Sequence, residues 1–377
     1  MAIQLFIPTF RVDECLEEIR GCLEKGWTGI GYKTVELEEQ WKKYTGFKHA
    51  HFLNSATAAL HLAIKVLKIQ NKWEDGDEII STPLTFVSTN HAILYENFKV
   101  VFADVDEYLC LDPIDVEKKI TSKTKAIVFV GLGGNVGKYK EIVKLCNKYN
   151  LKLILDAAHM TGTRLDGEIV GKEADVICYS YQAVKNLPTA DSGMVCFKKK
   201  EDDELVRKLS WLGIDKDTYT REKGSYKWKY EVDDLGYKYN GNSIMAAIAL
   251  VQLKYVDEDN RYRRQVAEWY DYYLRDHNVE TIPISIGCES SRHLYVIAVD
   301  NRDELITKLN ENNIFPGVHY RDNTEYKLYE YAKNTCPNSK YMSKRIISLP
   351  IHLKIEEDDV KYICNVIKEY AKNATKV

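Results

Sequence analysis

The chain has 377 residues, 45% of them hydrophobic, and its 53 basic and 56 acidic side chains leave a net charge of −3. This length accommodates two domains, or one large α/β domain with an appendage. The balanced charge excludes the basic surface typical of nucleic-acid-binding proteins, and it leaves no polybasic patch for a membrane surface.

The N-terminus and the cysteines bear on location and on metals. Residues 1–14 contain neither the charged region nor the long apolar region of a signal peptide, and no apolar run approaches the length of a membrane span. Nine cysteines are scattered without a C-x-x-C pair. This pattern is typical of reduced thiols rather than of a disulfide framework or a zinc site. We therefore expect a cytoplasmic protein with no metal, no nucleic-acid partner and no membrane partner.

Strand and helix patterns alternate from about residue 12 to about residue 200. The expected helices cover 13–24, 35–44, 56–69, 86–95, 114–120 and 139–149. The expected strands cover 49–53, 78–81, 100–105, 126–130, 151–155, 174–180 and 193–197. Repeated strand–helix units with short connections predict a mostly parallel sheet covered by helices on both faces, with ligands at the carboxyl ends of the strands.

The last third of the chain has a different pattern. A long charged helix is expected over 244–274. Shorter strand and helix signals follow at 293–299, 303–310, 345–349 and 358–370. We therefore predict an α/β protein with a large domain over 1–255 and a smaller C-terminal α/β domain over 256–377.

An aspartate and a lysine carry the first functional signal. Asp156 ends the apolar run 151–156, and Lys185 follows in the segment SYQAVKN. A pyridoxal phosphate enzyme needs an amine to hold the cofactor as a Schiff base and a carboxylate to keep the pyridine nitrogen protonated. Taken alone, the two residues are more simply a helix-capping aspartate and a solvated lysine, because short motifs often match by chance.

A candidate phosphate site precedes this pair. Residues 54–60 follow a short strand and open a helix with polar and small residues, so the amides of Ala56 and Thr57 are candidate anion donors. An ordinary capped helix is equally consistent with the pattern. Ser180 stands five positions before Lys185, where its hydroxyl would bond either a phosphate or the local backbone.

Two aromatic side chains lie next to strand ends. His159 follows Asp156 by three residues, and a structural and a catalytic role are about equally consistent with that position. Phe86 follows another strand end, where it would either pack in the core or stack on a planar ring.

The glycine-rich segment 131–138 resembles a phosphate-binding loop but matches neither template. Leu132 stands where a P-loop needs its first glycine, and Tyr139 replaces the required Ser or Thr. Val136 stands where the dinucleotide fingerprint needs its third glycine. We interpret this segment as a strand-to-helix turn.

Taken in order, these segments resemble the DegT/DnrJ/EryC1/StrS family of sugar aminotransferases. The matching segments cover nearly the whole chain: GWTGIG at 26–31, NSATAALHLA at 54–63, TPLTFVST at 82–89, DAAHMTGT at 156–163, SYQAVKN at 180–186, GYKYN at 236–240, RHLYVI at 292–297, GVHY at 317–320 and SLPIH at 348–352. The resemblance implies the fold-type-I aminotransferase architecture, a homodimer with shared active sites, and pyridoxal 5'-phosphate as cofactor, with pyridoxamine 5'-phosphate as its second form.

The resemblance also implies roles around the cofactor ring. Lys185 would form the Schiff base with the cofactor, and Asp156 would pair with the pyridine nitrogen. Phe86 would stack on the ring, and His159 would lie near the hydroxyl side of the ring.

Further implied roles concern the cofactor phosphate. Ser180, Thr57 and the amide of Ala56 would hold this phosphate. Asn240 would reach the same phosphate from the neighbouring subunit.

The implied sugar site is where this chain departs from the family. His319 and Tyr320 fall where family members contact the nucleotide-sugar. Gln182 replaces the histidine of S-F-H-x-x-K, Asp191 the glutamate of G-E-G-G, and Gly131 the histidine of a strand-end V-H. These positions border the cofactor or the sugar in the family, so Gln182 is a further candidate for substrate binding.

The predicted function is transamination of a nucleotide-linked 4-keto-6-deoxyhexose with L-glutamate as amino donor, giving a 4-amino-4,6-dideoxy sugar nucleotide for deoxysugar and polysaccharide (O-antigen) biosynthesis. One alternative is amination at C3 of a 3-keto-6-deoxy nucleotide sugar. A second is a non-catalytic binding or regulatory protein, which loss of Lys185 or Asp156 would have indicated. Because the lysine is retained, the dehydratase subgroup of the family is disfavoured.

Overall fold

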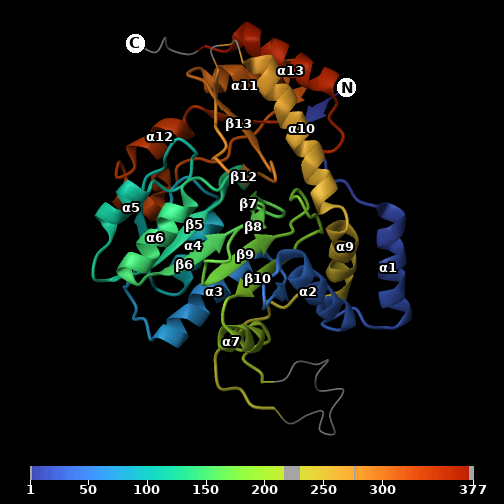
Figure 1. Cartoon of the computed structure of the whole chain (residues 1–377), viewed down its shortest axis with the longest axis vertical. Helices are drawn as coiled ribbons and strands as arrows, with labels where there is room; N and C mark the ends of the chain where they lie inside the picture. The colour runs from blue at the N-terminus through green and yellow to red at the C-terminus, as the bar shows by residue number, and fades with distance from the viewer. Residues whose placement is uncertain (1, 216–229, 276, 278, 373–377) are drawn as a thin grey trace.

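A seven-stranded sheet lies at the centre of the computed structural model, which describes residues 2–215, 230–275, 277 and 279–372 (Figure 1). Its strands run in the order β2-β10-β9-β6-β5-β3-β4. They are β2 (His51–Leu53), β3 (Glu78–Ser81), β4 (Lys99–Phe102), β5 (Thr124–Val130), β6 (Lys152–Asp156), β9 (Val176–Ser180) and β10 (Gly193–Phe197). β10 is antiparallel to both of its neighbours, and the other pairs are parallel. The predicted α/β fold with a mostly parallel sheet is confirmed.

Helices cover both faces of this sheet because its strands are apolar on both faces. In β6, Leu153 and Leu155 pack into one core and Ile154 packs into the other. The first core includes side chains of α2 (Tyr32–Thr45), α5 (Pro113–Lys119), α6 (Tyr139–Tyr149) and α9 (Ser243–Leu253). The second includes side chains of α3 (Ala56–Asn71), α4 (Val87–Tyr95) and α7 (Lys200–Ser210). The helix α1 (Val12–Glu24) packs against α9.

The helix expected over 244–274 is divided in the structure. α9 ends at Leu253 and α10 (Val256–Leu274) begins after Tyr255. The amide of Tyr255 bonds to the carbonyl of Gln252, three residues earlier, so the ladder tightens at this point. The prediction of a single helix was therefore wrong. The apolar periodicity continues through the junction between α9 and α10 and does not reveal the break.

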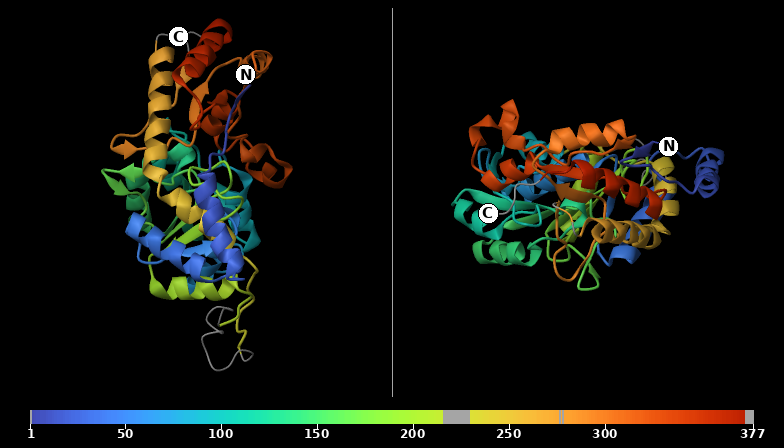
Figure 2. Two further views of the ribbon diagram at one scale, coloured as in Figure 1. Left: turned by 90° about the vertical axis from the view of Figure 1, so that its right-hand side faces the viewer. Right: turned by 90° about the horizontal axis from the view of Figure 1, so that it is seen from above.

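A smaller module lies beside α10, at the top of the molecule in Figure 1 and in the left view of Figure 2. Its three-stranded antiparallel sheet has the order β11-β13-β15, and α11 and α13 share its apolar core. The elements of this region are β11 (Glu280–Thr281), β13 (Tyr295–Ala298), α11 (Arg302–Glu311), β14 (Ile314–Phe315), α12 (Pro337–Ser343), β15 (Ile346–Leu349) and α13 (Glu357–Tyr370). The separate core agrees with a second domain, and its boundary at residue 255 remains a prediction.

Two small sheets connect the parts of the molecule. β1 (Ile3–Gln4) pairs in parallel with β14, so the start of the chain lies with the C-terminal module. β7 (Arg164–Leu165) lies between β8 (Glu168–Ile169) and β12 (Cys288–Glu289). In this way a loop that follows β6 is held against the segment that leads into β13.

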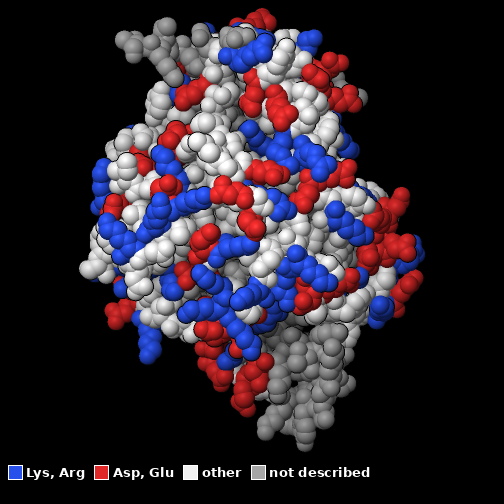
Figure 3. All heavy atoms as spheres, in the orientation of Figure 1, with Lys and Arg blue, Asp and Glu red and all other residues white. Residues whose placement is uncertain are grey.

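The described surface agrees with the balanced composition. Acidic and basic side chains are interspersed over the face in Figure 3. No helix among the described residues combines the length and the apolar character that crossing a membrane requires.

Candidate active site

A cavity of about 400 Å³ lies at the carboxyl ends of β5, β6 and β9. It is the kind of location where parallel α/β sheets bind ligands. The predicted residues that line it are Ala56, Thr57, Phe86, Asp156, His159, Ser180, Gln182, Lys185, His319 and Tyr320. Asn240 is the one predicted site residue that does not line it.

The carboxylate of Asp156 is buried at the end of β6. The hydroxyl of Thr89 donates to Asp156 Oδ2 at 2.8 Å, and the amide of Ala158 donates to Oδ1 at 3.1 Å. Burial raises the pKa of Asp156, although these two hydrogen bonds and the nearby Lys185 act in the opposite direction. The result is a carboxylate held in one orientation at the floor of the cavity.

The amine of Lys185 projects into the same cavity from the turn after β9. Burial lowers its pKa to about 8, and the charge of Asp156 opposes this effect. Its Nζ lies 3.5 Å from Nε2 of His293. A lysine with a lowered pKa is available as a nucleophile and as a base near neutral pH.

His159 is uncharged and held as a single tautomer. Burial, followed by the charge of Lys185, lowers its pKa well below the usual value. The amide of Gly133 donates to its Nδ1 at 3.2 Å, so the proton of the neutral ring is on Nε2. Nε2 then donates to the Tyr320 hydroxyl, 3.1 Å away, which leaves that hydroxyl proton free for a ligand.

The start of α3 supplies an anion cradle. Ser55 caps the helix by accepting from the amide of Ala58, and no described acceptor is bonded to the amides of Ala56 and Thr57. A Cβ at Gly193 would lie 2.7 Å from the Ala56 nitrogen, so only glycine allows β10 this close to the helix. Free amides at the positive end of a helix, with Ser180 beside them in the lining, fit a phosphate group.

Phe86, His319 and Tyr320 give the cavity lining an aromatic and polar part. Phe86 is 57% exposed within the cavity lining rather than packed in the core, and its ring centroid lies 6.0 Å from that of Tyr320. Nδ1 of His319 is bonded to Ser348 Oγ at 2.8 Å. Burial, followed by Lys185, lowers the pKa of His319 to about 4, so this ring is neutral.

The departures from the family pattern differ in position. Gln182 and Asp191 line the cavity, and Gln182 Oε1 accepts from the amide of Val184. Gly131 does not line it, and a Cβ at this position would lie 2.0 Å from the sulfur of Met160. The glycine-rich segment nevertheless borders the site, since Gly133 holds His159.

Asn240 lies apart from this cavity. It forms a bridge with Leu53, and its Nδ2 donates to the carbonyl of Gly241 at 2.9 Å. A contact from Asn240 to a cofactor phosphate across a subunit interface stays a prediction.

Three of the cavity residues without a role assigned from the sequence contact the predicted site residues or each other. Thr89 holds Asp156, His293 contacts Lys185, and Phe6 stacks on His293 with centroids 5.3 Å apart. Thr89 and His293 lie within the matching segments 82–89 and 292–297, which was the available signal. Phe6 had none.

A family model described as the DegT/DnrJ/EryC1/StrS aminotransferase family matches residues 11–368. UDP-4-amino-4-deoxy-L-arabinose–oxoglutarate aminotransferase of Shewanella sediminis is 35% identical over 390 residues, covering 98% of this chain and 99% of that protein. Spore coat polysaccharide biosynthesis protein SpsC of Bacillus subtilis is 33% identical over 374 residues, covering 96% and 95%.

Solved structures share the fold. Spr1654 of Streptococcus pneumoniae, designated a sugar aminotransferase and solved in a PMP form and a PLP form, superposes with a TM-score of 0.90. The PMP form is 28% identical in sequence and covers 98% of both chains. The architecture is that of the fold-type-I sugar aminotransferases, as predicted.

Proposed function

We propose that this chain, which belongs to the DegT/DnrJ/EryC1/StrS aminotransferase family, transfers the amino group of L-glutamate to C4 of a nucleotide-linked 4-keto-6-deoxyhexose. As a member of this family, the protein is an enzyme, a sugar aminotransferase. The proposal adds the donor, the nucleotide linkage, the position of amination and the roles of individual residues.

The observation that carries the proposal is the pairing of Lys185 with Asp156 in one cavity. Burial lowers the pKa of this amine to about 8, and the carboxylate is fixed by Thr89 and Ala158. The cradle at Ala56 and Thr57 lies in the same lining. An amine, a carboxylate and an anion site together fit pyridoxal 5'-phosphate, and a regulatory binding protein would not need the first two.

The residues divide the chemistry among them. When bound, pyridoxal phosphate would supply an electron-withdrawing ring for transfer of the amino group. Lys185 would attach the cofactor and, when released, would move a proton as a general base. Asp156 would keep the pyridine nitrogen protonated, Phe86 would stack on the ring, and His159 would lie near its hydroxyl side.

Different lining residues would hold the phosphate and the sugar. Ser180, Thr57 and the Ala56 amide would hold the phosphate. The Tyr320 hydroxyl and His319 face the sugar with neutral hydrogen-bonding groups, and Gln182 adds an amide. Neutral donors and acceptors suit the hydroxyls of a sugar.

A relative supports the donor and the position of amination. The name of the Shewanella sediminis protein combines a 4-amino sugar carried on UDP with oxoglutarate. Oxoglutarate is the keto acid that remains when glutamate gives up its amino group. The choice of C4 over C3 rests on this similarity.

Visible spectroscopy and product identification test the proposal. Protein incubated with pyridoxal phosphate should gain a visible absorption band that glutamate bleaches, and Lys185→Ala should not show the band of the attached cofactor. Glutamate and a nucleotide-linked 4-keto-6-deoxyhexose should then give a 4-amino product by NMR. Amination of a 3-keto sugar alone would favour the C3 alternative, and protein that stays colourless would contradict the proposed function.

The homodimer with shared sites has a separate test. Asn240→Ala should weaken phosphate binding, and it should be complemented by Lys185→Ala subunits. If Asn240 acts across the interface, a mixed population should recover about one quarter of the wild-type sites, because half of the dimers are mixed and each carries one intact site. Recovery would not occur if both residues served the same subunit.

A further inference from the structure

Among the described residues, the amine of Lys185 has one polar side-chain contact: its Nζ lies 3.5 Å from Nε2 of His293. Its ring is buried between Phe6, stacked at 5.3 Å, and His159, tilted at 4.4 Å. Burial, followed by the charge of Lys185, lowers the pKa of His293 well below the usual value, so the ring is neutral. A neutral imidazole has one protonated and one unprotonated nitrogen, and the question is which of them faces Lys185.

Asn186 determines which nitrogen of His293 carries the proton. Nδ2 of Asn186 lies 2.7 Å from the carbonyl oxygen of Ser291 and 2.7 Å from Oδ1 of Asn260. A backbone carbonyl only accepts, so the NH₂ group of Asn186 must point toward Ser291. Its Oδ1 is then the atom 3.0 Å from Nδ1 of His293, and that nitrogen must be the donor.

Asn260 fixes the orientation of the Asn186 amide through a second backbone carbonyl. Its Nδ2 donates to the carbonyl of Thr161 at 2.9 Å, which leaves its Oδ1 for Asn186. Two backbone carbonyls therefore fix the direction of every hydrogen bond in the chain Asn260–Asn186–His293. Asn186 and Asn260 are both buried, so water does not compete for these bonds.

We propose that Asn186 and Asn260 are positioning residues that hold His293 in the Nδ1-protonated tautomer, so that its unprotonated Nε2 accepts a hydrogen from the amine of Lys185. When Lys185 is released from the cofactor, one of its N–H bonds points at His293 and its rotation about the Cε–Nζ bond is restricted. The inference rests on the proposed function for the reactive role of Lys185, but the tautomer itself does not depend on it.

NMR of the protein as purified, labelled with ¹⁵N-histidine, tests the tautomer. The signals of His293 are those lost in His293→Phe, which keeps an aromatic ring against Phe6. The wild-type spectrum should show a protonated Nδ1 and an unprotonated Nε2. In Asn186→Ala the ring should shift toward the other tautomer.

Asn90→Ala is the matched control. Asn90 is also buried, and its Nδ2 donates to a backbone carbonyl, that of Thr82, and to an asparagine oxygen, that of Asn323. The control removes two bonds of the same kind, neither of them to His293, so the His293 signals should not change. A protonated Nε2 in the wild type, or an unchanged tautomer in Asn186→Ala, would overturn the inference.

A second experiment tests the contact with Lys185 in the pyridoxamine form of the enzyme, where this amine is free. The rate at which Lys185 is acetylated is measured against pH by mass spectrometry. A charge-assisted hydrogen bond to Nε2 raises the pKa of an ammonium group, so His293→Phe should lower the apparent pKa by about one pH unit. His293→Gln, which offers Oε1 as an acceptor, should restore part of the shift.

Other titratable groups share a cavity lining with Lys185, namely Asp156, Asp191, His159, His319, Tyr320, His352 and Arg263. All of them are unchanged in these variants, so a shift is assigned to position 293. An apparent pKa that is the same in wild type and in His293→Phe would refute the contact. Failure to bind pyridoxal phosphate would refute the proposed function instead and would leave the NMR result valid.

Discussion

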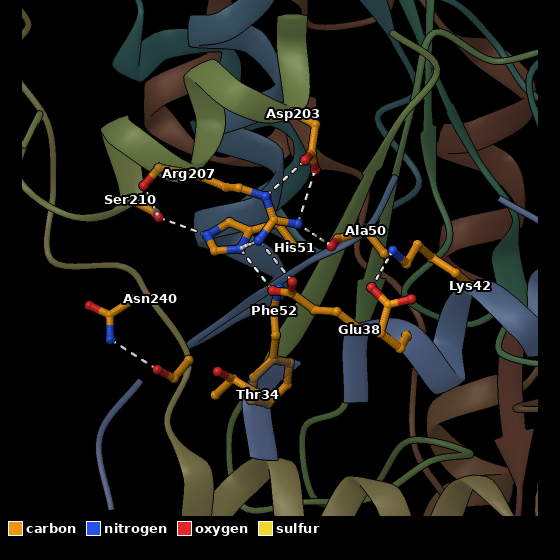
Figure 4. A network of polar contacts seen from close by, with 12 residues as sticks. Thr34, Glu38, Lys42, Ala50, His51, Phe52, Asp203, Arg207, Ser210 and Asn240 are labelled. Atoms are coloured by element: carbon orange, nitrogen blue, oxygen red, sulfur yellow. Dashed lines mark hydrogen bonds and ion pairs between the residues drawn. The ribbon is translucent and has the colours of Figure 1, made fainter. Parts of the chain in front are cut away.

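Two of the clusters of ionisable groups among the described residues are organised in opposite ways. In the active site, the amine of Lys185 faces neutral histidines and has no ion pair within hydrogen-bonding distance among the described residues. The other cluster, at the edge of the sheet beside β2, joins Glu38, His51 and Arg207 (Figure 4). There each charge is directly paired.

The paired cluster links three elements. Glu38 of α2 accepts from Arg207 of α7 at 2.8 Å, from Nδ1 of His51 at 2.9 Å and from the amide of Phe52 at 2.9 Å. Arg207 also donates to Asp203 at 2.8 Å. Burial opposes ionisation of Glu38 and is the largest influence, but its partners together outweigh it and lower its pKa to about 2.

The difference indicates which cluster serves stability and which serves chemistry. Pairing stabilises the charged form of Glu38, whereas burial destabilises the charged form of Lys185 and lowers its pKa to about 8. A shifted pKa alone does not identify a catalytic group, because both clusters have one. The direction of the shift relative to the charged form separates them.

Of the substitutions that test this difference between the two clusters, removal of the Lys185 amine should have the largest effect, and that effect is on catalysis. Lys185→Ala should lower kcat by about 10⁴-fold or more, because no other amine lines the cavity among the described residues. Turnover of glutamate and ketosugar measures this loss. Lys65→Ala is the control, since Lys65 pairs with Glu96 outside the cavity, and its kcat should stay near the wild-type value. A Lys185→Ala enzyme with wild-type kcat would falsify the assignment.

The next largest effect concerns Asp156. Asp156→Asn keeps an acceptor for Thr89 but removes the charge, and kcat should fall by about 10²–10³-fold. The visible spectrum of the bound cofactor should shift at the same time, because its ring nitrogen loses a proton. Asp175→Asn, at the partly exposed pair with Lys152, is the control and should leave spectrum and rate unchanged. Equal rates for both variants would remove Asp156 from the mechanism.

The paired cluster should respond to acid. The pKa of Glu38 falls from 4.5 to about 2 on folding, so its contribution is complete above pH 4.5 and disappears as the pH drops toward 2. This amounts to about 3 kcal/mol of unfolding free energy. Denaturant titrations between pH 5 and 2 should show the loss in the wild type and a flatter curve in Glu38→Gln. Parallel curves would mean that Glu38 is not ionised preferentially in the folded state.

The smallest expected effect is a gain in the free energy of unfolding when Lys185 is replaced, opposite in sign to the loss expected at Glu38. The folded pKa of Lys185, about 8, lies below the ordinary value of 10.5, so the folded state is disfavoured at pH 7 and gains stability as the pH rises from 8 to 10.5. Lys185→Met should therefore stabilise the cofactor-free protein at pH 7 by about 1–2 kcal/mol, less than the full shift implies because the amine borders a cavity that water can enter. Denaturant unfolding at pH 7 and pH 10 measures the gain, which should vanish at the higher pH. Destabilisation at pH 7 would contradict the comparison.

Much of the fold was predictable because its signals are local. Alternating apolar runs predict β6, β9 and α6 to within two residues of their observed bounds, since both periodicity and capping act over a few positions. The break between α9 and α10 was missed because a tightened turn leaves the apolar pattern intact.

By itself, the sequence determined most strands and helices of the large sheet, the family, and the positions of Asp156 at the end of β6 and of Lys185 in the turn after β9. The tertiary structure alone decided what surrounds these two groups. His293 lies 108 positions from Lys185 along the chain, and Thr89 lies 67 positions from Asp156. Such contacts form only when distant segments pack together, and burial, which shifts the pKa values, exists only in the folded state.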